Sequence, residues 1–538
     1  MKNRLRATLM LSALVAAGAC QDLTEVPADF VGPDNFYQNQ ADALAAVNSA
    51  YASFINLPSP FSSDQYLGRN FWMLVEYPTE YATSRLSAGN ERSMIGTFHS
   101  LFAPTHAYVE LYWAAAYAGI NRANAVIGRV PGIENMDATR REQVVAEAKF
   151  LRALHYYWLA GMFGGVPLKL EETTTISEDG VPRATVEETY AQIEKDLTEA
   201  AAVLPDAWPA SDWGRATRGA ALTLLGKAYL HSAQAFGITA NHQKAMDTFR
   251  LVQGMNYSLV SGAQYGSLFD GSNETASEII WSFQNVRVDG LGGQMTEWFT
   301  PNPSPNVSGP GEQNQFQAER PFYDSYDTAD VRKEATWLTE FTSGTRVITW
   351  AWTSGIQNAS NYGSTGPAVR KYLDWAAVED GAEEPDYVIL RYADVLLSLA
   401  EAINEVSGPT QEAYDLVNQV RTRAGIGSLT PGLSKDDFRN AVFLERKYEF
   451  AMELHGVFDM RRNWNWAKAR VEAQMAMARP TSAGGLNINA SPFTSSVEKC
   501  SVSPSSVCFN PIDDKWKLYP IPQHAIDLNA ALTQNPGW

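Results

Sequence analysis

Cys20 is the residue whose surroundings point most directly to a chemical role. It follows a basic start and an apolar run over 7–19, and it precedes a polar, acidic stretch over 21–30. This order is typical of a signal peptide, and the run is shorter than the roughly 20 residues of a membrane-spanning helix. Residues 17–20, Ala-Gly-Ala-Cys, resemble a lipobox, in which the signal is removed just before a diacylated cysteine. The sequence predicts lipidation at Cys20; the alternative is an ordinary secretory signal with an incidental cysteine.

Cys500 and Cys508 are the remaining two cysteines, and they bound the Ser-rich stretch CSVSPSSVC. In an exported chain, two thiols this close can close a small loop. The spacing therefore predicts a disulfide between them. Two free or metal-binding thiols are the alternative, although a zinc site would need further ligands and this stretch contains no histidine.

The rest of the chain carries no catalytic pattern. Gly226-Lys227 lacks both the earlier glycine and the following Ser or Thr of a phosphate loop. Neither G-x-S-x-G nor H-E-x-x-H occurs, and the seven histidines are scattered singly. Asp324, Asp327 and Asp330 are spaced by three, which suits a helix start better than a calcium loop. We predict no catalytic residue, no metal site and no cofactor; a carboxylate pair of the glycosidase type is the alternative, because sequence does not show the separation of two acids.

Composition indicates a large globular protein. The chain has 538 residues, of which 45% are hydrophobic, so it can bury a sizeable core. Its formal charge is −18, and removal of residues 1–19 takes away only basic side chains, which makes the mature chain more acidic. Nucleic acid is excluded as a partner on this ground, because binding phosphates requires a basic surface.

The sequence predicts a mainly helical scaffold. Apolar residues at three and four spacing predict helices over 40–54, 106–130, 137–164, 185–204, 216–236 and 241–253. Leu225-Gly226 and Tyr229 in one helix, with Ala245 and Phe249 in the next, have the spacing of tetratricopeptide helix pairs. In such pairs small residues allow close approach of the helices and large ones fill the groove.

The stretch from 254 to 385 differs from the rest. It is rich in Gly, Pro, Asn, Ser and aromatic residues and has no long periodic run, which predicts loops and short strands. Helical periodicity returns over 386–406, 410–425 and 434–454. An irregular insertion of this length is usually functional, because structureless loops inside compact domains are uncommon.

Four long motifs follow one another in the second half of the chain: YVILRYADVLLSLAEAINE (387–405), VNQVRTRAG (417–425), ERKYEFAMELHGVFDMRR (445–462) and LYPIPQHAIDLNAALTQNPGW (518–538). In this order they closely resemble the SusD/RagB family of outer-membrane nutrient-binding lipoproteins. The stretch EAKFLRALHYYWLAGMFGGVPL (147–168) and the lipobox at Cys20 are similar to the N-terminal part of the family. The resemblance therefore covers essentially the whole mature chain.

The resemblance implies a fold, a location and a partner. It implies a mainly α, tetratricopeptide-like helical scaffold whose long region of loops and short strands forms the ligand face. It also implies a lipid-anchored protein of the outer membrane, facing the cell surface, that delivers a glycan or similar nutrient to a TonB-dependent, SusC-like transporter. The expected division is 1–19 signal peptide, 20–36 lipidated tether, 37–253 N-terminal helical scaffold, 254–385 irregular ligand-binding region and 386–538 C-terminal helical part.

Two other classes of function stay open from the residues. The first is a protein adaptor without a small ligand, since tetratricopeptide arrays often bind proteins. The second is a surface glycoside hydrolase with an unrecognised carboxylate pair. The charged residues of the motifs are expected to form structural pairs or solvated helix faces rather than ligand contacts: Arg391, Glu401, Arg421, Glu445, Arg446 and Arg461. Their aromatic neighbours are expected in the core: Tyr392, Tyr448 and Phe458.

A glycan-binding surface needs flat aromatic faces for sugar rings, with amide, carboxylate or guanidinium groups nearby for the hydroxyls. An early loop and the irregular region supply both, and our candidates are Trp72, Tyr81, Arg85, Asn90, Trp298, Phe299, Trp350 and Trp352. Trp298 is the first of these, because the glycines and prolines on both sides of it predict a loop. Core packing is the alternative for each ring, since aromatic side chains are usually buried.

Lipidation at Cys20 gives the first testable prediction. Cells that express the wild type should incorporate a fatty-acid analogue into the protein, and cells that express Cys20→Ala should not, because the thiol is the attachment point. In-gel detection of the labelled protein is the measurement. Equal labelling of the two proteins, or an unlabelled wild type, would contradict the attachment.

Overall fold

The computed structural model of the chain describes residues 36–54, 67–84, 91–99, 101–174, 180–288, 290–300, 314–343, 345–351, 355–357, 367–379, 381–475 and 512–538. The lipidation and disulfide predictions, which fall on Cys20, Cys500 and Cys508, lie outside the described residues.

Helices form the first half of the described chain, as the periodicity predicted. They are α2 (Gln40–Ala52), α3 (Arg69–Glu76), α4 (Glu91–Gly96), α5 (Ala107–Arg129), α6 (Ala138–Phe163), α7 (Val186–Val203), α8 (Arg218–Ala235) and α9 (Asn241–Gln253), with short 3₁₀ turns η1 (Val130–Gly132) and η2 (Ala210–Asp212). Polar side chains accept the first free N–H groups of several helices; at α7, Thr185 and Glu188 form a complete capping box. Of these, α3 and α4 were not predicted, since each is too short to show a period.

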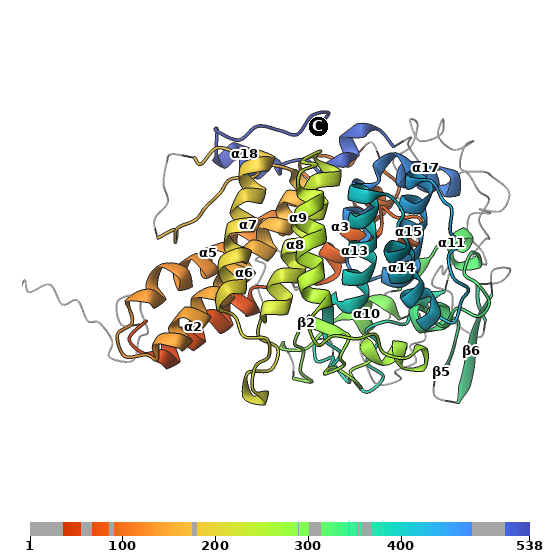
Figure 1. Cartoon of the computed structure of the whole chain (residues 1–538), viewed down its shortest axis with the longest axis horizontal. Helices are drawn as coiled ribbons and strands as arrows, with labels where there is room; N and C mark the ends of the chain where they lie inside the picture. Colours follow the sequence, from red (N-terminus) through yellow and green to blue (C-terminus); the bar gives the residue numbers. More distant parts are fainter. Residues whose placement is uncertain are drawn as a thin grey trace, which may run out of the picture.

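The helices pack as one continuous array, each against the next. Figure 1 shows α2, α5, α6, α7, α8 and α9 in order from the left side of the molecule to its centre, and α9 packs against the second helical half. The tetratricopeptide pattern is confirmed at α8 and α9, where a Cβ added to Gly226 would lie 2.7 Å from the ring of Phe249. Gly226 therefore sets how closely these two helices approach.

The second helical half also follows the prediction, with one correction. It contains α13 (Tyr392–Ser407), α14 (Gln411–Arg423), α15 (Lys435–Phe450), α16 (Gly456–Arg462) and α17 (Trp464–Met475). Residues 387–391, predicted as helix, form strand β9 (Tyr387–Arg391), which pairs antiparallel with β2 (Ile279–Phe283). Every residue of β9 is buried, and a continuously apolar strand has no alternation to separate it from the start of a helix.

The region between these halves consists of short elements, as predicted. Its helices and turns are η3 (Gly262–Leu268), α10 (Met295–Phe299), α11 (Arg320–Asp324) and α12 (Val331–Thr336), and its strands are β3 (Phe316–Ala318), β4 (Trp337–Leu338), β5 (Glu340–Ser343), β6 (Arg346–Ala351), β7 (Gly355–Gln357) and β8 (Ala368–Val369). One sheet has the order β1-β3-β8-β4, with β1 (Ala82–Ser84) contributed by the early segment, and β5-β6-β7 form another. Asp330 caps α12 through the N–H of Arg332, which confirms the helix start expected there.

Buried carboxylates hold the irregular segments together where regular hydrogen-bond ladders are short. Glu383 accepts from the N–H of Thr296, Asp386 accepts from the N–H of Asn285, and Asp374 accepts from several backbone N–H groups of 376–384. Burial raises the pKa of Glu383 to about 8 and that of Asp386 to about 7, while the donated hydrogen bonds oppose the rise. These side chains satisfy backbone donors that no strand partner could reach.

Ion pairs around Glu449 join the irregular region to the second helical half. We call this set the Glu449 cluster; it comprises Glu278, Arg332, Arg391, Arg423, Glu445, Glu449 and Glu453, all of them buried. Burial opposes the charge of Glu449, but the guanidinium groups around it hold its pKa well below the usual range. The motif residues Arg391 and Glu445 were expected as structural pairs or solvated faces, and the structure shows them as buried structural pairs.

The other motif residues are also mostly internal. Arg446 bonds to Asp394 and Asp459, and Glu401 bonds to Arg462. The Arg461 guanidinium lies 4.7 Å from the ring centre of Tyr519, and Arg421 is the one of the six that keeps substantial exposure, at 23% of its side chain. Tyr392 and Phe458 are buried in the core as expected, and Tyr448 packs against its edge.

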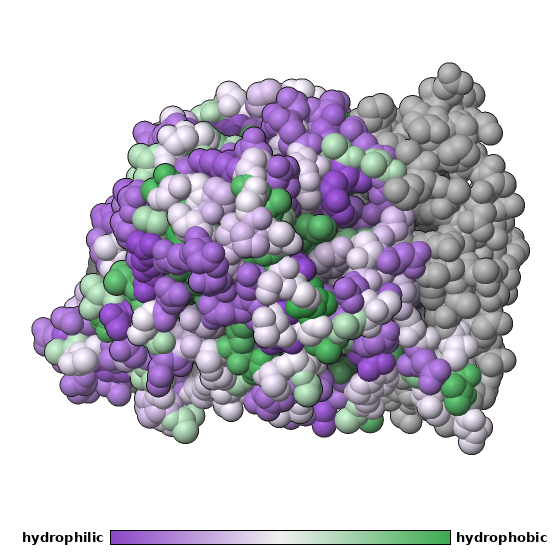
Figure 2. Space-filling view, turned by 45° about the vertical axis from the view of Figure 1, so that its right-hand side comes forward, coloured by the Kyte–Doolittle hydropathy of each residue, from purple (hydrophilic) through white to green (hydrophobic). Residues whose placement is uncertain are grey.

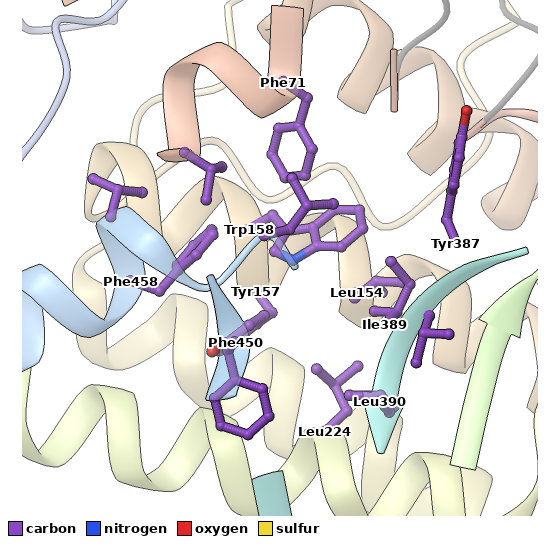
Figure 3. Close-up of a cluster of buried hydrophobic side chains, with 14 of the residues drawn as sticks. Phe71, Leu154, Tyr157, Trp158, Leu224, Tyr387, Ile389, Leu390, Phe450 and Phe458 are labelled. Atoms are coloured by element: carbon purple, nitrogen blue, oxygen red, sulfur yellow. The ribbon is translucent and has the colours of Figure 1, made fainter. Parts of the chain in front are cut away.

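A large apolar core extends through both helical halves of the described chain, and a smaller one lies among α2, α5 and α6. Figure 3 shows part of the large core, with Phe71 of α3, Trp158 of α6, Ile389 of β9 and Phe458 of α16 pointing toward one another. Phe71 and Trp158 have ring centres 4.9 Å apart. Segments far apart in sequence thus share one interior, so the irregular region is built onto the scaffold rather than beside it.

The C-terminal segment returns to the first helices. It contains η6 (Asp514–Lys517) and α18 (Gln523–Leu528), and in Figure 1 it runs along the top of the molecule in blue. The Tyr519 N–H donates to the carbonyl of Met162 at 2.8 Å, and the Asn535 amide donates to the carbonyl of Phe163 at 3.0 Å. Arg183 donates to Asn535 at 2.8 Å, which fastens this segment to the end of α6.

Two helical glycines give a prediction about the array. Gly226→Ala should lower the free energy of unfolding by about 1–3 kcal/mol, because the added methyl meets the Phe249 ring. Gly128→Ala is the matched control: a Cβ there meets nothing within 4 Å, so it should raise the free energy of unfolding by about 0.5–1 kcal/mol through helix propensity. Urea unfolding followed by circular dichroism measures both; equal effects would mean that contact with Phe249 is unimportant.

Glu383 gives a prediction about pH. Its folded pKa of about 8 lies above the ordinary 4.5, so the folded protein favours the protonated form. The stability that this group contributes is complete below pH 4.5 and is lost as the pH rises through about 8. Glu383→Gln should keep the acceptor for Thr296 but remove the titration, so its melting temperature should fall less than that of the wild type over this range.

The control for this experiment is Glu449→Gln. The depressed pKa of Glu449 means that its charge stabilises the protein above the ordinary carboxyl range and that this contribution is lost in acid. This variant should therefore be less stable than the wild type at neutral pH and converge with it in acid. If Glu383→Gln and the wild type decline in parallel with rising pH, the proposed role of Glu383 is wrong.

Candidate functional site

The two segments that carried the predicted ligand residues do meet in space. Strand β1 pairs antiparallel with β3, with Ala82 opposite Ala318 and Ser84 opposite Phe316, and β3 pairs in turn with β8. The early segment and the irregular region therefore form one sheet.

Three of the predicted rings belong to the core rather than to a surface. Trp72, Tyr81 and Phe299 are at most 2% exposed. The Trp72 indole N–H donates to the carbonyl of Leu67, and its ring meets the edge of Phe299 at 5.5 Å. Tyr81 donates to Glu76 in the interior. The expectation that these side chains face a ligand is wrong, because their rings fill the space between α3 and the irregular region.

Trp298 is also corrected. It lies in α10, not in an open loop, and it is 7% exposed, with the Arg69 guanidinium 4.0 Å from its ring centre. The glycines that suggested a loop serve close packing instead: Gly292 and Gly293 bond to the backbone of 381–383, and a Cβ on Gly292 would lie 2.5 Å from the Glu383 nitrogen. Glycine marks a close backbone approach here.

The remaining predicted residues are placed only in part. Trp350 lies in β6, opposite Ile356 of β7. Trp352, Arg85 and Asn90 lie outside the described residues. Their roles as ligand contacts stay predictions.

An open groove elsewhere has the features that the predicted residues lack. We call it the Trp213 groove; it encloses about 390 Å³ and is lined by Asn48, Tyr51, Ala52, Ser211, Asp212, Trp213, Gly214, Arg215, Ser282, Phe283, Gln284, Val286 and Leu291. These residues come from the end of α2, the turn η2 with the residues after it, and β2 with the segment after it. The loop between α7 and α8 that carries Trp213 hangs at the lower edge of the molecule in Figure 1.

Apolar surface is available on both sides of this groove. Trp213 is 47% exposed on one side, and Val286 and Leu291 are 46% and 50% exposed on the other. Figure 2 shows that the surface is mainly hydrophilic and that its larger apolar patches lie in the lower half of the view. An indole held half out of the protein offers one flat face to a ligand.

The turn that presents Trp213 has a fixed backbone. The backbone N–H of Trp213 donates to the Ala210 carbonyl, and the indole N–H of Trp281 donates to the carbonyl of Gly214 at 3.0 Å. Gly214 has φ of 88°, and a Cβ there would lie 2.4 Å from the Gln284 side chain. The left-handed conformation and the close contact both require glycine, so Trp213 is set at a defined position relative to the opposite wall.

Ion pairs fasten the same turn to the helices. Arg215 donates to Glu147 at 2.9 Å, to Asp212 at 2.7 Å and to Asn48 at 2.9 Å. Arg140 bonds to both Glu147 and Asp212. Burial raises the pKa of Glu147, and Arg215 and Arg140 oppose the rise. Two guanidinium groups and two carboxylates therefore join α2, α6 and the Trp213 turn.

Polar atoms suited to hydroxyl groups remain in the groove. Asn48 uses its carbonyl oxygen for Arg215, and Gln284 uses its amide nitrogen for Asp386 and Ser282. Within the described chain, no residue bonds to the Asn48 amide nitrogen, the Gln284 carbonyl oxygen or the Ser211 hydroxyl. The groove can thus stack a sugar ring on Trp213 and exchange hydrogen bonds with its hydroxyls, whereas Asp212, the carboxylate in the described lining, is committed to ion pairs.

A second hollow lies between α7, α8 and α9. It has a volume of about 200 Å³, and its rings, Tyr190 and Tyr229, are only 5% and 7% exposed. It therefore offers no flat aromatic face. Among the described residues no group of three His, Cys, Asp or Glu could hold a metal ion, and no described helix has the length and apolar character needed to cross a membrane.

Sequence reasoning missed Trp213. Its neighbours, in the run PASDWGR over 209–215, include a proline, a serine and a glycine. Turn-forming neighbours of this kind were the reason for choosing Trp298 as a candidate. Trp375, 45% exposed, was missed as well. Turn-forming residues near a tryptophan were the available signal in the sequence. Local composition does not show which of several such rings is buried.

Comparison with known proteins places this geometry in a family. Residues 239–538 match the SusD family, and residues 62–230 match a family described as starch-binding associating with outer membrane. SusD-like protein P2 of Formosa agariphila is 28% identical over 497 residues, which cover 86% of this chain and 90% of that protein.

Solved structures show the same fold. A SusD homolog from Bacteroides thetaiotaomicron has a TM-score of 0.75 at 24% identity, covering 94% of this chain and 98% of the other. Surface glycan-binding protein A from the same organism, in complex with laminarihexaose, has a TM-score of 0.68 at 18% identity, covering 92% and 99%. The tetratricopeptide-like architecture is confirmed by these likenesses. Because the family match covers more than half of the chain, from the start of α9 to the last residue, this protein belongs to the SusD family.

Proposed function

We propose that this protein is a non-catalytic, surface-exposed, lipid-anchored protein that binds a glycan and delivers it to a TonB-dependent outer-membrane transporter. The observation that carries the glycan-binding part is the Trp213 groove, where a half-exposed indole faces an apolar wall across hydrogen-bonding side chains. Sugar rings have apolar faces and hydroxyl edges, and this groove matches both. The anchor rests on the Cys20 signal, and the transporter partner rests on family membership.

Relatives support the ligand class. A relative named starch-binding protein SusD, from Bacteroides thetaiotaomicron, is 27% identical over 195 residues, or 35% of this chain. The related surface glycan-binding protein A holds laminarihexaose. We also propose that residues 254–385 form the ligand-binding region, extended by the 211–215 turn from the helical scaffold.

The test is glycan binding by the purified, lipid-free protein. Trp213→Ala should weaken binding by about 10- to 100-fold, because burying one such ring against a sugar contributes on the order of 1.5–3 kcal/mol. Its melting temperature should stay near that of the wild type, since the ring is half exposed. Calorimetry against a panel of neutral and acidic polysaccharides measures the affinity.

Two control variants separate binding from folding. Trp375→Ala removes an equally exposed indole outside the groove lining and should leave affinity unchanged. Trp298→Ala removes a buried ring and should lower the free energy of unfolding by about 3 kcal/mol or more.

Unchanged affinity in Trp213→Ala would exclude the groove as the glycan-binding site. Binding to no glycan would favour the adaptor, and release of reducing sugar over hours would favour the hydrolase.

A further inference from the structure

We propose that the Trp213 groove selects a neutral polysaccharide and discriminates against chains that carry carboxylate or sulfate groups. This inference rests on the proposed glycan-binding function and names the substrate class of the same site. It depends on how the charges around the groove are already used.

Among the residues that the structure describes, Arg215 is the only cationic side chain in the groove lining. Each of its three nitrogens donates to a protein acceptor: Nε to Asp212, Nη1 to Glu147 and Nη2 to Asn48, at 2.7–2.9 Å. Arg140 is shared between the same two carboxylates and also lies 4.6 Å from the ring centre of Trp208. The two positive and two negative charges cancel within this set.

An anionic ligand would compete with Glu147 and Asp212 for the charge of Arg215, whose side chain is only 13% exposed. The partner that it would displace most severely is Glu147, whose side chain is fully buried and whose charge depends on Arg215 and Arg140. A buried carboxylate deprived of its partner is strongly unfavourable. The internal pairs therefore compete effectively with a ligand carboxylate or sulfate.

Of the two charged side chains among the described residues of the groove lining, the more exposed one is negative. Asp212 lines the groove, and its side chain keeps 28% exposure. On the opposite wall, the amide nitrogen of Gln284 is already donated to Asp386. A ligand anion would thus face a carboxylate, while the described lining residues Val286 and Leu291 are apolar.

A neutral sugar meets no such conflict. Its apolar face can stack on Trp213, and its hydroxyls can donate to the Gln284 carbonyl or accept from the Asn48 amide. The formal charge of −18 on the whole chain adds a long-range preference in the same direction.

The experiment uses derivatives that share one backbone. The neutral polysaccharide that binds best in the panel is compared with its hydroxyethyl derivative and with its carboxymethyl derivative at equal degree of substitution. The hydroxyethyl derivative should bind within about threefold of the parent, and the carboxymethyl derivative at least tenfold more weakly. The hydroxyethyl arm controls for the bulk of the substituent, so the difference reports its charge.

Two further measurements assign the discrimination to the groove. Asp212→Asn should reduce the ratio of the affinities for the hydroxyethyl and carboxymethyl derivatives at least threefold. The affinity of this variant for the neutral parent shows whether the Trp213 turn is intact. If the variant no longer binds the neutral parent, the two derivatives are compared on the wild type at increasing salt concentration instead. The ratio of their affinities should then shrink, because salt screens the charge of Asp212.

The outcomes separate this inference from the proposed function. Equal affinity for the two derivatives, or tighter binding of alginate or a sulfated galactan than of any neutral chain, would overturn neutral selectivity while leaving glycan binding intact. A discrimination that survives in Trp213→Ala would place it outside the groove and overturn the assignment. Failure of every polysaccharide, neutral or acidic, to bind would overturn the proposed function itself.

Discussion

The buried salt bridges of the Glu449 cluster are the constraint on which the rest of the structure depends. Glu449 on α15 holds Arg391 at the end of β9, Arg423 at the end of α14 and Arg332 on α12. Removing one partner from such a set typically costs about 3–5 kcal/mol, because the others are left buried and unpaired. The cluster thus gives little net stability over an apolar core but penalises any other arrangement of these four elements.

This constraint reaches the candidate site through β2. Glu278 joins the Glu449 cluster through Arg391 and Arg423, and the strand that follows it carries Ser282 and Gln284 into the wall of the Trp213 groove. The opposite wall is fixed by a smaller set of the same kind, in which Arg215 and Arg140 share Glu147 and Asp212. Paired charges therefore fasten both walls, in addition to the α2 helix and the β2 strand that contribute to them.

The helical scaffold could be predicted from the sequence, but the site could not. Long helices such as α5 and α6 show enough turns for their apolar period to appear, and their observed ends lie within a residue of the predicted ones. Residues 387–391 were misassigned because a strand buried on both faces has no alternation. The pairing of β1 with β3, which joins the early segment to the irregular region, could not be read from spacing, because each strand has only three residues.

Exposure of individual rings was beyond sequence reasoning for a physical reason. Whether Trp298 or Trp213 faces solvent depends on contacts made from elsewhere in the chain: Arg69 covers the first, and Arg215, anchored on Glu147, fastens the turn that carries the second. Residues 69 and 147 lie far from the rings whose exposure they decide. Turn composition around a tryptophan therefore predicts a bend and leaves its environment open.

The return of the C-terminal segment to α6 has a consequence for biogenesis. The carbonyls of Met162 and Phe163, near the middle of the first helical half, find their partners in Tyr519 and Asn535. The N-terminal helices consequently cannot complete their packing while the chain is still emerging, either from the ribosome or from a translocation channel. For a chain that is exported, as proposed for this protein, an unfolded state during transport is compatible with this topology, because the contacts of Tyr519 and Asn535 with α6 form only after those residues have crossed.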